Sequence, residues 1–470
     1  MEKYIFELNE EEPKYIQIAN HIKNLINSKC INDSEKLPPI RKLAEFLNVN
    51  NVTIVNCYKK LQSEGYAYQK MGSGTFAKRR EVMQKFKNEY SKEIKNIINK
   101  NHGDIIDFTG ESLSDLYFPI KEFKEVLNRV LDRDGAEALL IQETLGYGEL
   151  RETINNAFWN KRFDEEEILI LSGAQQGIDI AAKAIVNIND NVMVEKPTYG
   201  GALSVFKWRR ANIFEVPIND DGIDIKLFEN ILKKNKIKCF YAMSYFHNPT
   251  GASYSKECKL KILELAEKYD FYIIEDDYLS ELIYDENLNH EPFKVLDKGN
   301  RVFYIKSFSK IFLTGIRLGY MIYPDGFKEV MQSSKINTDI ATSTLMQRAL
   351  ELYIREGYFK GHIEILKKEY KKRYNMMRNL IKDQLSDYIE MKEPRGGLYF
   401  YLKLKDKNIS SKELFYRLKD KKIFITPGIV FYKDIDGGVD SFRLCFSQTN
   451  ENKIKEGIYV IKEVINKWRI

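Results

Sequence analysis

The run Ser307-Phe308-Ser309-Lys310, followed seven residues later by Arg317, is the most informative stretch of this chain. A lysine flanked by small hydroxyl residues can form a Schiff base with an aldehyde cofactor. The two serines and the arginine can hold a phosphate, the arginine as a planar fork. The run therefore predicts an anchor for pyridoxal phosphate (PLP), with Lys310 as the covalent partner.

Around this run, from about residue 105 onward, short apolar runs alternate with stretches of helical periodicity. Such alternation indicates an α/β fold around a mostly parallel sheet. Ligands of these sheets bind beyond the carboxyl ends of the strands. The runs expected as strands are Ile168–Leu171, Val192–Val194, Cys239–Met243, Tyr272–Ile274, Val302–Ile305 and Leu318–Ile322.

Polar groups follow four of these expected strands. Taken singly, each has an ordinary explanation as a turn, a solvated helix start or a surface charge. Four groups at strand exits favour one shared ligand site instead. The four groups are Ser172-Gly173-Ala174-Gln175, His247–Gly251, Glu275–Tyr278 and Ser307–Lys310.

Each group has a chemical role toward PLP. A carboxylate beside the pyridine nitrogen keeps that nitrogen protonated, and Asp276 is the residue nearest the strand end. Tyr278 and Asn248 can hydrogen-bond the phenolic oxygen of the ring. Tyr199 can contact the ring or the ligand, and is equally well explained as a core residue. The phosphate is expected at Ser307, Ser309, Arg317 and the backbone of Gly173, Ala174 and Gln175, at the start of a helix.

The N-terminal segment has a larger positive net charge than the chain as a whole. Residues 13–80 contain twelve Lys or Arg and four Asp or Glu, a net charge of +8, whereas the chain totals +6. A basic excess confined to one small segment is typical of a surface that meets a phosphate backbone.

The same segment has the pattern of a winged helix-turn-helix. Helical spacing from Tyr15 to Ile26 is followed by a helix after Leu37-Pro38-Pro39, a third helix after a polar turn, and a glycine-tipped hairpin. The exposed start of the third helix would read bases, and the preceding helix and the wing would contact phosphates. A small protein-interaction module with a solvated basic face is the alternative. The expected DNA contacts are Asn50, Asn51, Thr53, Arg41, Lys42, Lys70 and Gly72.

Composition places the protein in the cytoplasm. We expect no membrane span, no secretory signal and no metal site, and the five scattered cysteines suit a reducing compartment as buried, inert thiols. The predicted organisation is a winged helix-turn-helix domain at 1–78, a partly helical linker at 79–104 and a large α/β domain at 105–470.

Two family resemblances cover most of the chain. The run from Leu37 to Ala44, with Thr53, Tyr58, Leu61, Glu64-Gly65-Tyr66 and the wing 72–76, resembles the GntR-type bacterial regulators, although Asn50-Asn51 stands where members often have Ser-Arg. Residues 105–470 resemble the fold-type I, aspartate-aminotransferase-like PLP enzymes. The motifs in order are 146–151, 172–175, 248–251, Asp276, Tyr278, 307–310, Arg317 and Arg443.

The second resemblance implies a smaller C-terminal subdomain at about 340–470 and a role for Arg443 in binding the carboxylate of an amino-acid ligand. A surface arginine at a strand edge is the alternative for Arg443. Five residues before Gly146 the family usually has a tyrosine that reaches the partner subunit's cofactor phosphate. This chain has Ile141 there, which questions that contact.

A GntR-type head on an aminotransferase-like body is the arrangement of the MocR-type transcriptional regulators. That resemblance implies a head-to-tail homodimer that binds double-stranded operator DNA and senses an amino compound or PLP through the Schiff base at Lys310. The alternative is a working aminotransferase, transferring amino groups from amino acids to 2-oxo acids, that carries an incidental head. Lys310 would then also act as the general base for the proton shift.

Overall fold

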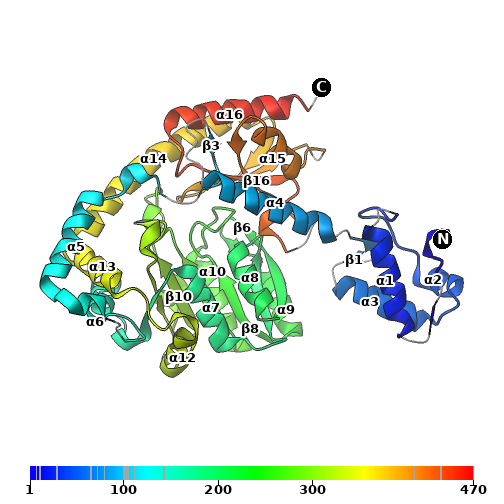
Figure 1. Cartoon of the computed structure of the whole chain (residues 1–470), viewed down its shortest axis with the longest axis horizontal. Helices are drawn as coiled ribbons and strands as arrows, with labels where there is room; N and C mark the ends of the chain where they lie inside the picture. Colours follow the sequence, from blue (N-terminus) through cyan, green and yellow to red (C-terminus); the bar gives the residue numbers. More distant parts are fainter. Residues whose placement is uncertain are drawn as a thin grey trace. The chain divides into compact units, whose positions relative to one another are not determined.

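The protein forms two compact units, Met1–His102 and Gly103–Ile470, here called the head and the body. They are seen in a computed structural model (Figure 1). It describes residues 1–6, 8–9, 12–27, 30–63, 66–70, 72–78, 80–98, 105–110, 113–140, 143–406, 408–433 and 437–468. Each unit is described by itself.

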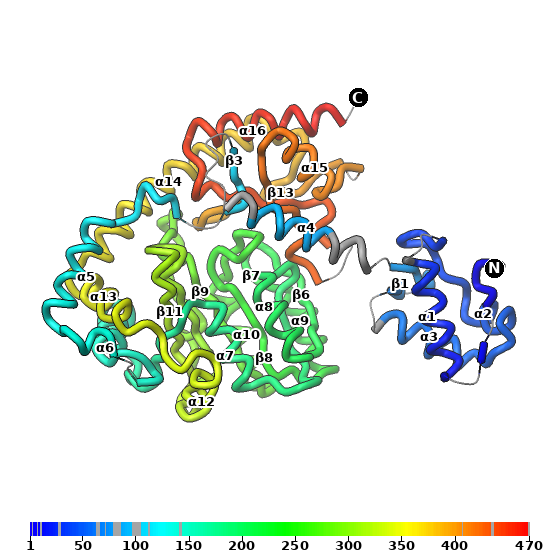
Figure 2. Tube along the Cα trace, in the orientation of Figure 1, coloured from blue at the N-terminus to red at the C-terminus, as the bar shows by residue number. Residues whose placement is uncertain are grey.

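The head has the predicted order of three helices and a hairpin. The helices α1 and α3 pack together (Figure 2), and the predicted apolar positions Ile18, Ile22, Leu43, Ile54 and Leu61 are buried in one core. The order confirms the winged helix-turn-helix. The elements are α1 (Lys14–Asn27), α2 (Ile40–Phe46), α3 (Asn51–Ser63), β1 (Ala67–Lys70) and β2 (Gly74–Ala77).

Two parts of the head were not predicted. The wing strand β2 pairs with β1 and also bonds the segment before α2, where Ala77 N–H donates to Glu35 O at 2.8 Å and Leu37 N–H donates to Thr75 O at 2.8 Å. In addition, Tyr4 packs into the head core ahead of α1. Both contacts are made between segments distant in sequence, so local periodicity carries no sign of them. Within the predicted linker, the structure has one long helix, α4 (Arg80–Ile98).

The body is built on an eight-stranded sheet in the order β4-β11-β10-β9-β8-β5-β6-β7. The five strands from β10 to β6 in this order are parallel, and the pairings of β11 and β7 are antiparallel. All six predicted runs are strands, but β6 and β7 were missed. The strands are β4 (Ile168–Leu171), β5 (Asn191–Lys196), β6 (Asn212–Asn219), β7 (Gly222–Ile223), β8 (Ile237–Ala242), β9 (Tyr272–Asp277), β10 (Val302–Ser307) and β11 (Gly319–Ile322).

Helices cover both faces of this sheet, which confirms the predicted layered α/β fold. On one face α9 and α10 enclose a core that includes Phe228, Phe240 and Phe271. On the other, α7 approaches so closely that a Cβ on Gly177 would lie 2.7 Å from the Leu171 side chain. The helices are α5 (Ile120–Asp134), α6 (Gly148–Trp159), α7 (Ala174–Ile185), α8 (Gly200–Trp208), α9 (Ile225–Lys234), α10 (Lys256–Tyr269), α11 (Phe293–Leu296), α12 (Lys328–Asp339) and α13 (Thr344–Arg355).

A smaller subdomain contains an antiparallel sheet in the order β12-β13-β16-β15. The start of the body also belongs to it, because β3 pairs in parallel with β14 and Cys445 N–H donates to Phe108 O at 2.8 Å. The elements are β3 (Ile106–Asp107), α14 (Tyr358–Leu385), β12 (Ile389–Met391), β13 (Tyr399–Leu404), α15 (Ser411–Lys419), β14 (Ile423–Phe424), β15 (Thr426–Pro427), β16 (Ser441–Cys445) and α16 (Glu451–Asn466).

The cysteines only partly follow the expectation of buried thiols. Cys57, Cys239 and Cys445 are buried, whereas Cys30 is exposed and Cys258 is half-buried. In the part of the chain that the structure describes, every helix is too short or too polar to cross a membrane.

Shortening Phe228 should destabilise the body strongly. Its side chain is 0% exposed and meets the rings of Phe240 and Phe271 edge-on, at centroid distances of 5.0 and 5.8 Å. We expect Phe228→Ala to lower the free energy of unfolding in urea by ~3–5 kcal/mol. Leu227→Ala, one residue earlier and 39% exposed, is the control and should change it by under ~1 kcal/mol. Equal losses would contradict the packing described.

Candidate functional site at the carboxyl edge of the sheet

Lys310 lies in the loop that leaves β10 at Ser307, and its side chain is half-buried. The loop is braced by its own serines, since Ser309 N–H donates to Ser307 Oγ at 3.2 Å. Arg317, which is exposed, reaches back to Ser309 Oγ with Nη1 at 3.4 Å. The lysine, both serines and the arginine are therefore grouped at one strand exit.

The turn after β4 meets this group from the neighbouring side. Arg317 Nη2 donates to Ser172 O at 3.0 Å, and α7 begins at Ala174, directly after the turn. Gly173 has φ +103°, and a Cβ there would lie 2.8 Å from Arg317 Nη2. Only glycine leaves room for the guanidinium beside these backbone N–H groups. Because a helix N-terminus and an arginine both favour anions, the turn suits a phosphate.

Asp276 brings a carboxylate into the core beside this edge. Residues Glu275 to Asp277, predicted to follow the strand, are instead the last residues of β9, because pairing with β10 continues to their level. Tyr241 OH donates to Asp276 Oδ2 at 2.8 Å, while Oδ1 is buried without a hydrogen-bond partner among the described residues. Burial raises the pKa of Asp276 to about 7, and the Tyr241 hydrogen bond only partly opposes it.

The next residue, Asp277, has the opposite environment. It accepts from His290 Nε2 at 2.7 Å, Tyr304 OH at 2.9 Å and Lys306 Nζ at 3.2 Å. Burial alone would raise the pKa of Asp277, but Lys306 and His290 hold it well below its usual range. The pKa values of these two adjacent carboxyls are thus shifted in opposite directions, a pattern typical of functional sites. Asp277 is fully engaged with the protein, which leaves Asp276 as the carboxylate open to a ligand.

Arg443 and Asn248 form another hydrogen-bonded pair of predicted site residues. Arg443, on β16, is 2% exposed, so the surface interpretation of this residue was wrong. Its Nη1 donates to Asn248 Oδ1 at 2.6 Å and its Nη2 to Thr109 O at 3.2 Å. Nearby, Tyr278 is buried and its OH donates to Phe246 O at 3.0 Å. A buried guanidinium beside a carboxamide can take a carboxylate in a fixed orientation.

The loop that carries Asn248 rests on a buried acid that sequence reasoning missed. Glu195 Oε1 accepts from Met243 N–H at 3.0 Å and from Tyr254 OH at 2.7 Å. Its Oε2 lies 3.2 Å from His247 Nε2, and His247 Nδ1 pairs with Thr250 Oγ1 at 2.8 Å. Because Glu195 lies inside β5 among apolar residues, its pattern resembles that of an ordinary core strand.

Tyr199 and Gln175 meet at the starts of α8 and α7. Tyr199 is the residue before α8 and is half-buried, and a Cβ on Gly201 would lie 2.3 Å from its ring. Gln175 is exposed and its Nε2 donates to Gly201 O at 3.1 Å. Burial first, and then the neighbouring Asp276, hold the pKa of Tyr241 well above its usual value, and Tyr241 OH donates to Asp276 Oδ2 at 2.8 Å. Tyr241 was the other missed residue, since it occupies an apolar run.

Most of the predicted DNA contacts are exposed on the head. Asn50 Oδ1 accepts from Val52 N–H at 2.9 Å at the start of α3. Asn51, the first residue of that helix, is exposed. Thr53 is half-buried. The exposed members are Arg41, Lys42, Asn50, Asn51, Lys70 and Gly72. Ile141 stands where the family usually has a tyrosine that contacts the partner subunit's cofactor phosphate. This residue lies outside the described residues.

The buried carboxyl of Asp276 should give the cofactor-free protein a characteristic pH dependence. The folded state keeps a proton up to about pH 7 that an ordinary carboxyl, with a pKa of 3.8, releases earlier. Stability therefore falls as pH rises through this interval and stays lowered above it. We expect Asp276→Asn to be more stable than wild type by on the order of 2–4 kcal/mol at pH 8.

Urea unfolding of the cofactor-free proteins at pH 4.5 and pH 8 measures this difference. The gain should shrink to roughly a quarter at the lower pH, because Asp276 is protonated in the folded wild type there and only the unfolded carboxyl, with its pKa of 3.8, is still largely ionised. Asp285→Asn, which removes an exposed carboxylate paired with Arg395 at 2.7 Å, is the control and should show no gain at pH 8. A gain of equal size at both pH values would contradict the assignment.

Comparison with known proteins places both units. The aminotransferase class I and II family matches residues 109–461, and the gntR family of bacterial regulatory proteins matches residues 14–77. Aromatic-amino-acid aminotransferase 1 of Thermococcus litoralis is 30% identical over 372 residues, covering 77% of this chain and 88% of that protein. The crystal structure of Pyrococcus horikoshii kynurenine aminotransferase has a TM-score of 0.76 at 31% identity, covering 81% and 94%.

Other relatives span both units. One of them, the uncharacterized HTH-type transcriptional regulator YdfD of Bacillus subtilis, is 28% identical over 480 residues, covering 97% of this chain and 98% of that protein. Aminotransferases of class I and II typically depend on PLP. The chain belongs to the aminotransferase class I and II family, and the GntR-type head fused to this body makes it a MocR-type transcriptional regulator.

Proposed function

We propose that the body of this regulator holds PLP on Lys310 and responds to a small amino compound, and that this response changes how the head binds DNA. The observation that carries the proposal is the unpartnered, buried Oδ1 of Asp276 at the same sheet edge as the Gly173 turn and Lys310. When bound, the cofactor supplies an aldehyde that captures amines and a ring that withdraws electrons.

Different residues at this edge of the sheet would bind different parts of PLP. Arg317, Ser309 and the N–H groups after Gly173 would bind the phosphate, since Arg317 already donates to Ser309 Oγ and to the carbonyl of Ser172, which opens this turn. Asp276 would hold a proton on the pyridine nitrogen. A cation beside Oδ1 favours the ionised carboxylate and so reverses the effect of burial on its pKa. Tyr278 and Asn248 would bind the phenolic oxygen.

The effector is best matched by an amino compound that also carries a carboxylate. Arg443 is buried and oriented by Asn248 and Thr109, so its guanidinium is held in place before any ligand arrives. A carboxylate bound there would place the amine of a small ligand near the PLP-bearing lysine. The fixed fork of arginine supports selection of a planar carboxylate over a neutral group.

The head would bind operator DNA with α3 in the major groove. Asn51 can pair with an adenine through two hydrogen bonds, whereas Arg41, Lys42 and Lys70 would bind phosphates. The net charge of +8 over residues 13–80 supports binding that weakens with salt. Since DNA is the partner, we place the protein in the cytoplasm.

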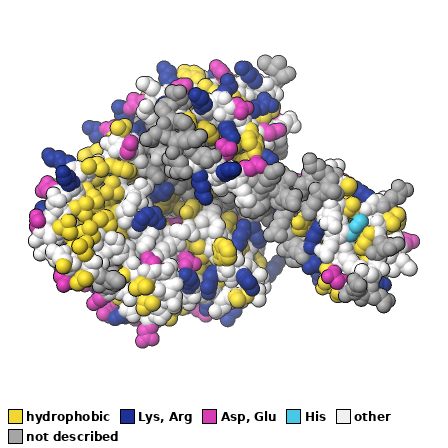
Figure 3. Space-filling model, viewed as in Figure 1, with side chains coloured by type: hydrophobic (Ala, Val, Ile, Leu, Met, Phe, Trp, Pro, Cys, Tyr) yellow, Lys and Arg dark blue, Asp and Glu magenta, His cyan; other side chains and the backbone are white. Residues whose placement is uncertain are grey.

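A second copy of the chain is the proposed partner of the body. Hydrophobic side chains gather over α5 and its neighbours (Figure 3), and exposed members near there include Leu116, Ile120 and Leu131. Exposed apolar groups of this kind mark contact surfaces. A head-to-tail homodimer would cover them and present two heads to the DNA. Effector and DNA affinity would then be coupled reciprocally.

Transamination is the second candidate function. It is supported by the 30% identity to an aromatic-amino-acid aminotransferase and by the match of Lys310, Asp276 and Arg443 to the residue types that transamination needs. In that case Lys310 would move the proton between carbon atoms as general base. Rapid transfer from amino acids to 2-oxoglutarate, without specific and salt-sensitive binding to DNA upstream of its own gene, would favour the enzyme over the regulator.

Removing Lys310 should abolish covalent capture of PLP. We expect wild-type protein incubated with PLP to show a visible absorbance band and, after borohydride reduction, a mass increase on the peptide that contains Lys310. Lys310→Ala should show neither, since the amine of Lys306, near the end of the same strand, is held by ion pairs with Asp277 and Glu281. Lys298→Ala, which changes an exposed lysine outside the site, is the control. A wild type without the band would refute the PLP proposal.

Two head variants should separate base reading from phosphate binding. Asn51→Ala should weaken binding to the operator by ~1–3 kcal/mol while leaving binding to unrelated DNA nearly unchanged. Lys42→Ala should weaken both about equally and reduce the slope of log affinity against log salt by about 1. Titrations of the full chain at several salt concentrations measure both effects. Equal behaviour of the two variants would contradict the docking geometry.

A further inference from the structure

A closed polar network stands behind the turn that would bind the phosphate. Ser172 N–H donates to Gln176 Oε1 at 2.7 Å, and Ser172 Oγ donates to Asp339 Oδ2 at 2.7 Å. Gln176 Nε2 donates to the same Oδ2 at 2.6 Å. With Arg317 on Ser172 O, every polar group of Ser172 is engaged. The residue that opens the turn is therefore fixed by partners from α7, α12 and the arginine.

The centre of this network is a buried lysine that the proposed function does not use. Lys335, on α12, is 0% exposed, and its Nζ donates to Asp339 Oδ1 at 2.5 Å, Thr342 Oγ1 at 2.8 Å and Gln176 Oε1 at 3.2 Å. Burial lowers the pKa of Lys335, although Asp339 opposes this. Burial also tends to raise the pKa of Asp339, but the bonds from Lys335, Gln176 and Ser172 hold it below its usual value.

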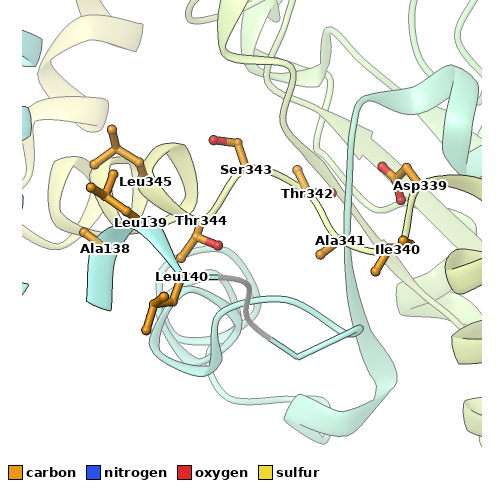
Figure 4. Close-up of a pocket in the computed structure, with 10 residues that line it drawn as sticks. All are labelled: Ala138, Leu139, Leu140, Asp339, Ile340, Ala341, Thr342, Ser343, Thr344 and Leu345. Carbon is orange, nitrogen blue, oxygen red and sulfur yellow. The ribbon is translucent and has the colours of Figure 1, made fainter. Parts of the chain in front are cut away.

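The segment that supplies Asp339 and Thr342 connects α12 to α13. Asp339 and Thr342 turn to one side of this connection and Ile340 and Ala341 to the other, which borders a cavity of about 490 Å³ (Figure 4). Ile340 has φ +63°, a conformation that β-branched residues rarely adopt. Such a backbone persists only where its surroundings hold it, and the bonds of the two flanking polar residues provide that hold.

We propose that Lys335 and Asp339 are positioning residues that hold the turn at Ser172 to Gln175 in its phosphate-receiving shape. They act through Ser172 and Gln176 and touch no cofactor themselves. The proposal rests on the proposed PLP site and specifies which part of the ligand the network serves. Because the network attaches only to the phosphate side, losing it should cost affinity for a phosphorylated ligand and spare the ring and aldehyde.

The test compares PLP with pyridoxal, which lacks the phosphate. Dissociation constants of both are measured on the full chain from visible absorbance. Asp339→Asn and Lys335→Met each remove one charge at nearly constant size, and Ser172→Ala removes only the hydroxyl. We expect each to weaken PLP binding about tenfold, as for a lost hydrogen bond to a charged group, and pyridoxal binding less than about twofold.

Lys328→Met is the matched control, because Lys328 lies on the same helix and its exposed ion pair with Glu166, at 2.6 Å, does not reach the turn. It should leave both constants unchanged. Equal loss of PLP and pyridoxal affinity would show a general structural role and overturn the proposal, as would no loss of either. If a charge variant does not fold, Ser172→Ala decides. Wild type that captures neither ligand would refute the PLP site itself, a distinguishable result.

Discussion

One carboxylate buried without a full set of partners is the constraint on which the site depends. Asp276 lies at the end of β9 with Oδ2 bound by Tyr241 and Oδ1 unpartnered among the described residues. Burying a charge in this way is unfavourable unless a cation or donor completes it. A protonated ring nitrogen at this position would stabilise the buried carboxylate. The neighbouring strand exits carry Lys310 and the turn at Gly173, for which we propose a role in binding phosphate.

The parallel sheet explains why these groups meet. β8, β9 and β10 are adjacent and parallel, so their carboxyl ends lie at one edge. In the register, Ile305 is opposite Asp276, which places the Ser307–Lys310 loop just beyond the carboxylate. Arg317 stands just before the antiparallel β11, whose first residue, Gly319, pairs with Leu171 at the end of β4, so the arginine lies beside the turn after β4. Residues from four separated segments are in this way brought to one edge of the sheet, where we propose that the cofactor binds.

Most of the helices and strands could be predicted because each has a local pattern of apolar residues. Apolar runs of three to five residues identified β4, β5, β8, β9, β10 and β11, and helical spacing with a glycine-tipped hairpin identified the head. The prediction failed where a pattern was not local. The more exposed strand β6 lacks a clear apolar run, and the wing strand next to Glu35 exists only through pairing at a distance.

The site shows the same division. Lys310, Asp276, Asn248, Arg317 and Arg443 were named from sequence because their residue types and motif order are chemically distinctive. Tyr241, Glu195, Lys335 and Asp339 could not be named, because each occupies a helix or strand whose pattern is ordinary and acquires its role only from neighbours across the fold.

The sequence by itself determined the two units, the order of their elements and the chemical groups offered to a cofactor and to DNA. Only the tertiary structure decided which of two adjacent carboxyls is open to a ligand: Lys306 and His290 pair with Asp277, and nothing equivalent reaches Oδ1 of Asp276 among the described residues. The physical reason is that charge compensation in a core depends on distances between side chains, which sequence order does not specify.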